Sequence, residues 1–552
     1  MPEPAYAVEG GGADPPQSPR SVSAGWLTLG ICVGYVVLFG AIALVRVHQI
    51  GKPITFDTQN YQYYSGFAEI HGFGSAISLP GQLETYLDPQ LNVLYYLLIT
   101  HLPPRLAVSA IALGQSLSVS VLALLVWRLA RSTTTSRVVP PLAGLLAGAV
   151  ASFSPIYSGT TGQTSSDALL ALPLFVAVAL LYKVLAVPRT GGIAFRNTLV
   201  AGLLLGLTGE LKFTEASYSA AIFVAFAVAV LLVRSRAGWT YRHCVMLAGT
   251  VGLAALVIAV ALYLPEALLL WHRYRAPFFP FYNGILHSPY LLPKSYNPGY
   301  AATSPASFWF HISRLLVGGQ NTTNGMFPDP VESPVLFFGL VITAAMLVVD
   351  LIRRDKPQAV FLEISVLLGF ALWDVVFGYY RYLAPREMAA GAVVIVLLFL
   401  HRELYHPAAL LALACALAVG TVYAQPVRRG HRGEFGSSYF AIAPKAFNDL
   451  QGAGVVLVGV QPMGFLIPYL PAGTDVVRAG GNLEQVMSKA WWEHVARTVE
   501  SVHRPWWVVF DVLEPAVVIT PRLQQVGLPP SFHDCHEVGT AVFAVKVCRV
   551  TT

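Results

Sequence analysis

Apolar runs that recur along the whole chain constrain its fold more than any other feature of the sequence. A helix needs about 20 apolar residues to cross a bilayer. Charged residues make up only 12% of the chain, about half the share found in soluble domains, so lipid is the expected solvent. We predict an α-helical polytopic membrane protein with about eleven transmembrane helices, of which the fifth and tenth are short. The predicted spans are residues 24–47, 106–130, 138–156, 168–187, 198–211, 216–233, 244–264, 335–351, 360–377, 388–400 and 408–423.

Short loops rich in arginine predict how the chain is threaded through the membrane. If the N-terminus is cytoplasmic, nearly every such loop falls on the cytoplasmic side, as the positive-inside rule requires. We therefore predict a multi-pass protein of the inner (plasma) membrane with an extracytoplasmic C-terminus. The net charge is +6, but because the basic residues lie mainly in these loops we expect no nucleic-acid partner. The residues that support this threading are Arg128, Arg131, Arg137, Arg189, Arg196, Arg234, Arg236, Arg242, Arg353, Arg354, Lys356 and Arg402.

The same threading divides the chain into a tail, a membrane domain and a soluble domain. Residues 1–23 are rich in Pro and Gly and predict a short disordered cytoplasmic tail. Residues 24–424 form the predicted membrane domain, with long outward segments at 48–105 and 265–334. Residues 425–552 predict a small extracytoplasmic α/β domain, because "GVVLVGV" and "PWWVVFDVL" are strand-like and 483–502 contains a helix-like stretch.

The predicted C-terminal domain contains no Gly-rich phosphate loop and no nucleophile elbow. A lid or packing module is therefore favoured over a separate catalytic domain. Cys535 and Cys548 both fall in this domain, and because an outward domain lies in an oxidising space we predict that they form a disulfide. No CxxC pair or His/Cys ligand spacing occurs in the sequence, so no zinc site is expected.

Charged residues collect at the predicted outer ends of several spans, where an unpaired charge in lipid is costly. For any single residue, the simpler explanation is snorkelling or a helix-end ion pair. As a group, however, the cations lie on the side that the positive-inside rule disfavours. Such a patch would suit the phosphate of a lipid. The candidate phosphate ligands are Lys212, Arg273, Arg275, Arg381 and Arg386, and Asp167 is a substrate-binding candidate at the entrance of the fourth span.

The stretch "ITFDTQNYQYYSGFAEIHGFG" (residues 54–74) follows directly on the first span and is too polar to lie in lipid. Its Asp57 is a candidate general base, which would take the proton of an acceptor hydroxyl during glycosyl transfer. The alternative is that Asp57 only caps the N-terminus of a helix. Nearby aromatic, amide and acidic side chains would stack on sugar rings or hydrogen-bond to them. These substrate-binding candidates are Asn60, Tyr61, Tyr64, Glu84 and Asp88.

Several segments resemble the GT-C superfamily of polytopic membrane glycosyltransferases, and in particular its bacterial members. They are "FDTQNYQYY…LETYLDPQLNVLYYLL", "GLLLGLTGELKFT", "RAPFFPFYNGILHSPY" and "YYRYLAPREM". The resemblance implies a GT-C-like fold and a polyprenyl-phosphate sugar as donor, with an envelope glycan, a lipid or a protein as acceptor. It also implies that Asp57, the acid of the first outward loop, is the catalytic base in preference to Asp88. Because this loop has no Asp-x-Asp pair, no divalent metal or other cofactor is expected.

Two other functions fit the same topology. A transporter or flippase for a lipid-linked sugar would have an internal repeat and broken helices near mid-membrane, and the two halves of the sequence show no such similarity. A non-catalytic subunit for envelope assembly would hold a partner with its outward loops. That subunit would tolerate the loss of Asp57.

Overall fold

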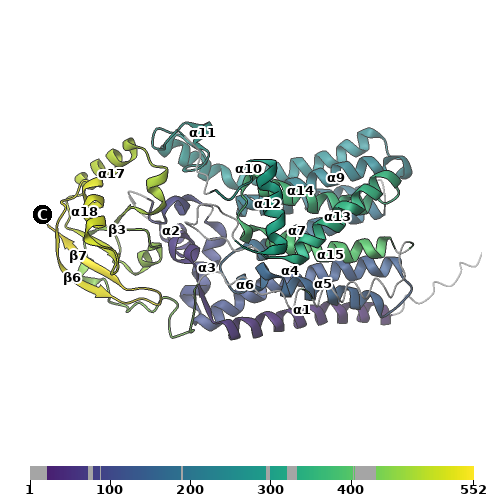
Figure 1. The fold of residues 1–552 in the computed structure, drawn as a ribbon, viewed down its shortest axis with the longest axis horizontal. Coiled ribbons are helices and arrows are strands. Elements are labelled where there is room, and N and C mark those ends of the chain that lie inside the picture. Colours follow the sequence, from purple (N-terminus) through teal and green to yellow (C-terminus); the bar gives the residue numbers. More distant parts are fainter. Residues whose placement is uncertain are drawn as a thin grey trace, which may run out of the picture.

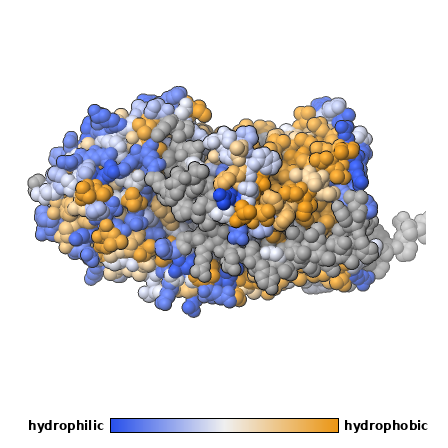
Figure 2. Space-filling model, in the orientation of Figure 1, coloured by the Kyte–Doolittle hydropathy of each residue, from blue (hydrophilic) through white to orange (hydrophobic). Residues whose placement is uncertain are grey.

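The computed structural model describes residues 22–72, 79–87, 89–187, 191–293, 299–319, 332–401 and 431–551, together with residues 403 and 420. Figure 1 shows a bundle of long helices with a C-terminal domain of strands and short helices at one end. We call this end of the bundle the domain end, and the opposite end, where α1 (Val22–Ile50) begins, the far end. Figure 2 shows hydrophobic side chains gathered over the bundle and hydrophilic ones over much of the C-terminal domain.

Nine helices of the described residues are long and apolar enough to cross a membrane. Each predicted span up to 388–400 coincides with a helix of the bundle, which confirms the polytopic helical fold; span 408–423 lies outside the described residues. The third helix, α5, has only 15 residues, because Ser154 precedes Pro155 and takes an extended ψ there. Besides α1, the bundle contains α4 (Pro104–Thr133), α5 (Val139–Phe153), α7 (Asp167–Ala186), α8 (Gly192–Leu211), α9 (Ala216–Ala237), α10 (Tyr241–Tyr274), α13 (Pro334–Arg353), α14 (Pro357–Val376) and α15 (Ala384–Leu400).

The helix α15 forms the centre of the bundle. In the most apolar stretch of the span Tyr380–Leu400, which includes α15, 89% of the residues are buried. The helix packs on α4, α5, α13 and α14. In the most apolar stretch of α10, in contrast, only 17% of the residues are buried, so this helix lies at the edge of the bundle. It continues to Tyr274 although Pro265 lies within it, so the predicted outward segment 265–334 begins as a continuation of this helix. Membrane helices tolerate an internal proline because neighbouring groups satisfy the backbone groups it frees.

The described parts of the two long loops fold into short elements at the domain end. The first loop contains β1 (Lys52–Ile54), the π-helix η1 (Thr58–Gln62), α2 (Tyr63–His71), η2 (Gln82–Tyr86) and α3 (Gln90–His101). The second contains α11 (Asn283–Leu286) and α12 (Pro305–Val317). Single turns also occur between or beside the long helices: α6 (Pro155–Thr160), η3 (Phe213–Glu215) and η4 (Tyr380–Leu383).

The C-terminal domain is built on a five-stranded sheet in the order β4-β3-β5-β7-β6. The strands β3 (Gly454–Val458), β4 (Asp475–Ala479) and β5 (Trp506–Asp511) are parallel, while β6 (Phe532–Val538) and β7 (Val545–Val550) are antiparallel. The connections include α17 (Lys489–Ser501), α18 (Ala516–Gln525), η5 (Asn448–Leu450), η6 (Gly464–Tyr469) and η7 (Gly481–Gln485). The predicted α/β class is confirmed, and a disulfide joins Cys535 on β6 to Cys548 on β7 (S–S 2.06 Å).

The first loop and the C-terminal domain are held together by main-chain and buried polar contacts. The strand β1 pairs antiparallel with β2 (His431–Gly433). The buried ammonium group of Lys52 donates hydrogen bonds to the carbonyl oxygens of Ser438 and Tyr439, and the Tyr439 hydroxyl donates to Pro53 O at 2.7 Å. Burial lowers the pKa of Lys52. These contacts fix the C-terminal domain over the domain end of the bundle.

We predict that Gly464→Ala destabilises this junction. A Cβ at residue 464 would lie 1.9 Å from Asn60 O, a backbone atom that cannot move aside alone. Overpacking of this kind costs about 1–3 kcal/mol, so thermal unfolding of the detergent-solubilised protein should occur at a lower temperature. The matched control is Gly249→Ala on α10, where a Cβ meets nothing within 4 Å. Equal unfolding temperatures for Gly464→Ala and the wild type would contradict the tight junction.

Candidate active site

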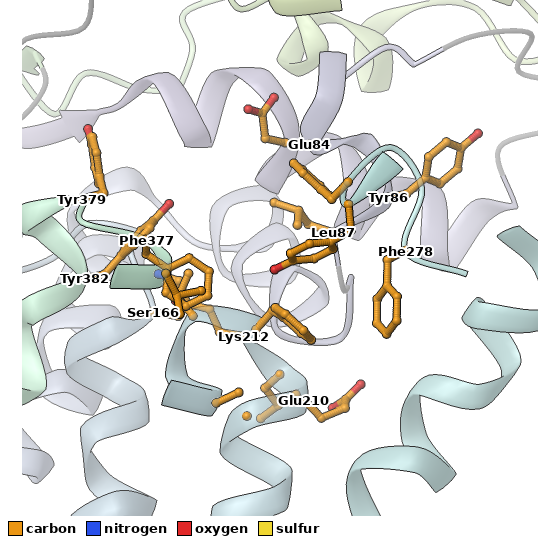
Figure 3. A pocket seen from close by; sticks show the side chains of 18 of the residues that line it. Glu84, Tyr86, Leu87, Ser166, Glu210, Lys212, Phe278, Phe377, Tyr379 and Tyr382 are labelled. Carbon is orange, nitrogen blue, oxygen red and sulfur yellow. The ribbon is translucent and has the colours of Figure 1, made fainter. Parts of the chain in front are cut away.

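A cavity of about 1580 Å³ lies where the first loop, the domain end of the bundle and the C-terminal domain meet. Its lining comes from η1 and η2, from α8, α9 and α10, from the turn between α14 and α15, and from residues 460–462 and 481–485. Figure 3 shows Glu84 and Glu210 on opposite sides of the cavity, with Lys212 and Tyr382 among the side chains that project into it. The cavity is therefore rich in ionisable groups.

An ion pair between Asp57 and Arg381 forms part of the polar wall. Arg381 Nη2 lies 2.7 Å from Asp57 Oδ2, and both side chains are largely buried. The guanidinium carbon lies 5.1 Å and 5.3 Å from the ring centres of Tyr379 and Tyr382, a cation–π arrangement. Asp57 occupies the N-cap position of η1, but its side chain makes no capping hydrogen bond. The capping alternative is therefore wrong, and the side chain is turned into the cavity.

A second ion pair lies beside the first. Lys212 Nζ lies 2.6 Å from Asp167 Oδ1, and Ser165 Oγ donates a hydrogen bond to Asp167 Oδ2 at 2.6 Å. Lys212 reaches this position because α8 ends at Leu211 and residue 212 is extended. Its ammonium group lies 4.6 Å from the Tyr382 ring centre. Two cations from separate elements thus approach the same aromatic ring, each with its own carboxylate.

Glu84 is held by amide side chains from two domains. Asn482 Nδ2 donates hydrogen bonds to Glu84 Oε1 and Oε2 at 3.0 and 3.2 Å, and Asn60 Nδ2 donates to Oε2 at 3.0 Å. Burial raises the pKa of Glu84 to about 7, and the negative charge of Asp57 adds to this rise, while the Asn482 hydrogen bond opposes it. A carboxyl group with this pKa changes between its protonated and ionised forms near neutral pH.

The amide network continues through Gln82. Its Oε1 accepts a hydrogen bond from Asn482 N at 2.8 Å, and its Nε2 donates to Asn60 Oδ1 at 3.1 Å. Leu83 N in turn donates to Asn482 Oδ1 at 3.1 Å. The C-terminal domain therefore helps to position the carboxylate of the first loop, so its part in the site goes beyond that of a distant lid.

The remainder of the cavity is an apolar groove between α8, α9 and α10. Its small residues let the helices approach closely: a Cβ on Gly206 would lie 2.2 Å from Ala255 O. Along α10 the lining runs from Gly252 to Ala267, about 22 Å at the rise of an α-helix. The residues that line the groove include Leu205, Gly206, Gly209, Ala220, Phe223, Gly252, Ala255, Ala259, Val260, Tyr263, Leu264 and Ala267.

The other predicted site residues are distributed unevenly. Tyr61 lines the cavity, and burial raises its pKa well above the usual value for tyrosine. Asn60 and Tyr64 do not line the cavity. Asn60 donates a hydrogen bond to Glu84, which does line it, and Tyr64 is buried in an apolar cluster. Asp88 lies outside the described residues.

Three of the predicted phosphate ligands do not line this cavity. Arg273 and Arg275 are exposed at the end of α10, because that helix extends beyond the predicted span. Arg386 is buried within the bundle, where its guanidinium carbon lies 4.3 Å from the Tyr218 ring centre. It belongs to α15, whose start is completely enclosed by other helices. Of the five candidate cations, the structure brings Lys212 and Arg381 into the cavity.

Sequence reasoning missed the contribution of the C-terminal domain. Asn482 has no motif around it, and only its hydrogen bonds across the domain boundary reveal its role. Tyr379 and Tyr382 could have been found from the sequence, because they lie close to Arg381 in the segment "YYRYLAPREM".

Among the described residues, a group with metal-binding spacing lies away from the cavity. It consists of Asp350, Glu363 and His401, whose ligand atoms all lie within 4.8 Å of one another. The sequence does not reveal it, because its members come from α13, from α14 and from the residue that follows α15.

We predict that Glu84→Gln reduces the pH dependence of stability. Between pH 4.5 and about 7 the unfolded chain loses the Glu84 proton while the folded chain keeps it. The stability from Glu84 is thus full below pH 4.5 and lost as the pH rises to about 7. From about pH 5 to 8, the unfolding temperature of Glu84→Gln should fall less than that of the wild type, by at least about 2 °C.

The control for this comparison is Glu69→Gln, which changes an exposed glutamate of the same loop. It should show the same pH dependence as the wild type. An equal decrease in unfolding temperature in all three proteins would show that folding does not raise the pKa of Glu84.

The chain resembles known proteins in structure. No protein-family model matches it, and no curated protein sequence matches it. It is similar to ArnT from Cupriavidus metallidurans bound to undecaprenyl phosphate, with a TM-score of 0.52 and 14% identity over 96% of this chain and 99% of that chain. For the apo state of ArnT, the values are 0.50 and 14% over 96% and 98%. The apo form of the Archaeoglobus fulgidus oligosaccharyltransferase gives 0.45 and 11% over 94% and 75%. At this identity the ArnT likeness establishes the fold, and the chain therefore has a GT-C-like fold.

Proposed function

We propose that the chain is a membrane glycosyltransferase of the GT-C type, which moves a sugar from a polyprenyl-phosphate donor to an acceptor hydroxyl. The observation that carries this proposal is the shape of the cavity. A polar region with Lys212 and Arg381 continues into an apolar groove between α8, α9 and α10. A ligand that fills both parts has an anionic head and a long apolar chain.

A polyprenyl phosphate has this chemistry. Its phosphate would be recognised by the guanidinium group of Arg381, which can donate several hydrogen bonds, and by the ammonium group of Lys212 as a point charge. Its prenyl chain would lie in the groove, where it replaces lipid contacts. The fold shared with ArnT, which has been solved bound to undecaprenyl phosphate, supports the same ligand class.

Donor binding would rearrange the two ion pairs. Arg381 and Lys212 now lie against Asp57 and Asp167, so a phosphate competes with these carboxylates. Buried Arg381 Nε has no hydrogen-bond partner among the described residues, which leaves it a donor for the phosphate. We propose that the phosphate draws Arg381 away from Asp57 and that the freed carboxylate then faces the acceptor.

Asp57 is the proposed general base. The acceptor hydroxyl loses its proton to Asp57 as its oxygen attacks the anomeric carbon, and the polyprenyl phosphate leaves with the electron pair of the broken C–O bond. Arg381 and Lys212 stabilise the charge on the departing phosphate. Glu84 instead orients the acceptor through its amide network. This mechanism uses no divalent metal, because the two cations supply the positive charge.

The acceptor in this proposal is an envelope glycan, a lipid or a protein that enters beneath the C-terminal domain. Residues 460–462 and 481–485 of that domain line the cavity, so the domain would contribute to acceptor recognition. The proposed reaction takes place on the extracytoplasmic face of the membrane. This orientation follows from the arginine-rich loops at the far end.

We predict that Asp57→Asn abolishes transfer but not donor binding. Asparagine has nearly the same shape but accepts no proton, so the rate should fall by about 10²–10⁴-fold. Because Arg381 no longer has an anionic partner, polyprenyl phosphate should bind at least as tightly as to the wild type. Transfer is measured as release of polyprenyl phosphate from a panel of polyprenyl-phosphate sugars, and binding is measured in nanodiscs.

The matched comparison is Glu84→Gln, which removes the other carboxylate of the first loop. It should keep transfer within about tenfold of the wild-type rate, because Glu84 only orients the acceptor. Loss of transfer in Glu84→Gln with full activity in Asp57→Asn would assign the base to Glu84. Full transfer activity in both variants would exclude both carboxylates as the base. No transfer by the wild type with any donor of the panel would favour a transporter or a non-catalytic assembly subunit.

A further inference from the structure

A buried group of ionisable side chains at the far end of the bundle has no part in the proposed transfer. Asp350 lies in the last turn of α13, Glu363 in the second turn of α14, and His401 directly follows α15. All three side chains are 0% exposed. Glu363 is separated from Val375, a lining residue of the cavity, by about 18 Å along α14. The group is therefore independent of the cavity.

The polar contacts of this group are incomplete. His401 Nε2 lies 2.9 Å from Asp350 Oδ2. Neither oxygen of Glu363 has a hydrogen-bond partner among the described residues, and nor does Asp350 Oδ1. All three residues place a ligand atom within 4.8 Å of the other two. Two buried carboxylates that face each other without a donor are costly unless a positive charge lies between them.

Lys356, a cation that contacts His401, is used elsewhere. Lys356 donates hydrogen bonds to Leu400 O and to Glu403, and its Nζ lies 3.2 Å from His401 Nδ1. The C-termini of α13 and α15, the negative ends of their dipoles, lie beside the group, and the N-terminus of α14 offsets only one of them. The electrostatics at this point thus call for a further cation.

We propose that Asp350, Glu363 and His401 bind one divalent transition-metal ion, with Zn²⁺ as the preferred ion. One imidazole nitrogen and two carboxylate oxygens are a zinc donor set, and a water or a bidentate carboxylate completes four-coordination. The imidazole selects against Mg²⁺ and Ca²⁺, which prefer oxygen ligands. The ion would join the far ends of α13, α14 and α15 and so stabilise the centre of the bundle.

Metal binding at His401 requires a specific arrangement of its ring. Nε2, which faces Asp350, becomes the ligand atom, so the ring proton must lie on Nδ1. Lys356 then keeps its contacts with Leu400 O and Glu403 and gives up its contact with Nδ1. The sequence gives no indication of this site, because its three residues are far apart in the chain and form no short ligand spacing.

The test measures zinc bound to the full-length protein in detergent, with any affinity tag removed. The protein is treated with EDTA, loaded with ZnCl₂, desalted and analysed by mass spectrometry of metals. The wild type should retain about one Zn²⁺ per chain. Glu363→Gln, which keeps the volume of the side chain and loses its charge, should retain at least tenfold less, and His401→Ala should do the same. The control is His536→Ala, which removes a half-buried histidine near Asp449 in the C-terminal domain and should leave zinc content unchanged.

Thermal unfolding provides a second readout for variants that fold. Zn²⁺ should raise the unfolding temperature of the EDTA-treated wild type and of His536→Ala, but not that of Glu363→Gln. Retention of less than about a tenth of an ion per wild-type chain would overturn the proposal and leave a shared proton between the carboxylates. Equal zinc content in Glu363→Gln and the wild type would overturn it as well.

Discussion

The ion pair between Asp57 and Arg381 connects the parts of the molecule on which the site depends. Asp57 comes from the first loop, directly after the strand that pairs with the C-terminal domain. Arg381 comes from the turn between α14 and α15, the most buried span of the bundle. Two charges of opposite sign in a partly dehydrated cavity attract each other more strongly than in water. Their pairing therefore fixes the first loop relative to the bundle and holds the cavity in its described shape.

The same electrostatic constraint explains why the cavity suits an anionic lipid. Each cation in it already has a carboxylate partner, so the pairs remain close to neutral while the site is empty. A phosphate would compete for Arg381 and Lys212 and leave Asp57 without its cation. In this account, the chemical group that takes the proton becomes available only when the donor is in place. The apolar groove supplies the binding energy for the prenyl chain, since burial of apolar surface is favourable.

The sequence predicted the spans well because each apolar run has to satisfy its own backbone as a helix in lipid. It also predicted that Lys212 and Arg381 lie at the same end of the bundle, because successive spans alternate in direction and both residues follow a span that runs outward. It placed Arg273 and Arg275 at the end of the seventh span, but it could not show that the length of α10 carries them outside the lining of the cavity. The burial of Arg386 depends on the central position of α15, which no local pattern encodes. Likewise, the contacts of Asn482 with Glu84 cross 398 positions of sequence separation.

The central claim is that one cavity holds a polyprenyl phosphate with its head at the two ion pairs. The most direct test is a cryo-EM structure of the protein in nanodiscs with added polyprenyl phosphate. The account predicts phosphate density within hydrogen-bond distance of Arg381 and Lys212, an Asp57–Arg381 distance longer than 2.7 Å, and chain density between α8 and α10. Lipid density outside this cavity, with the Asp57–Arg381 pair intact, would contradict it.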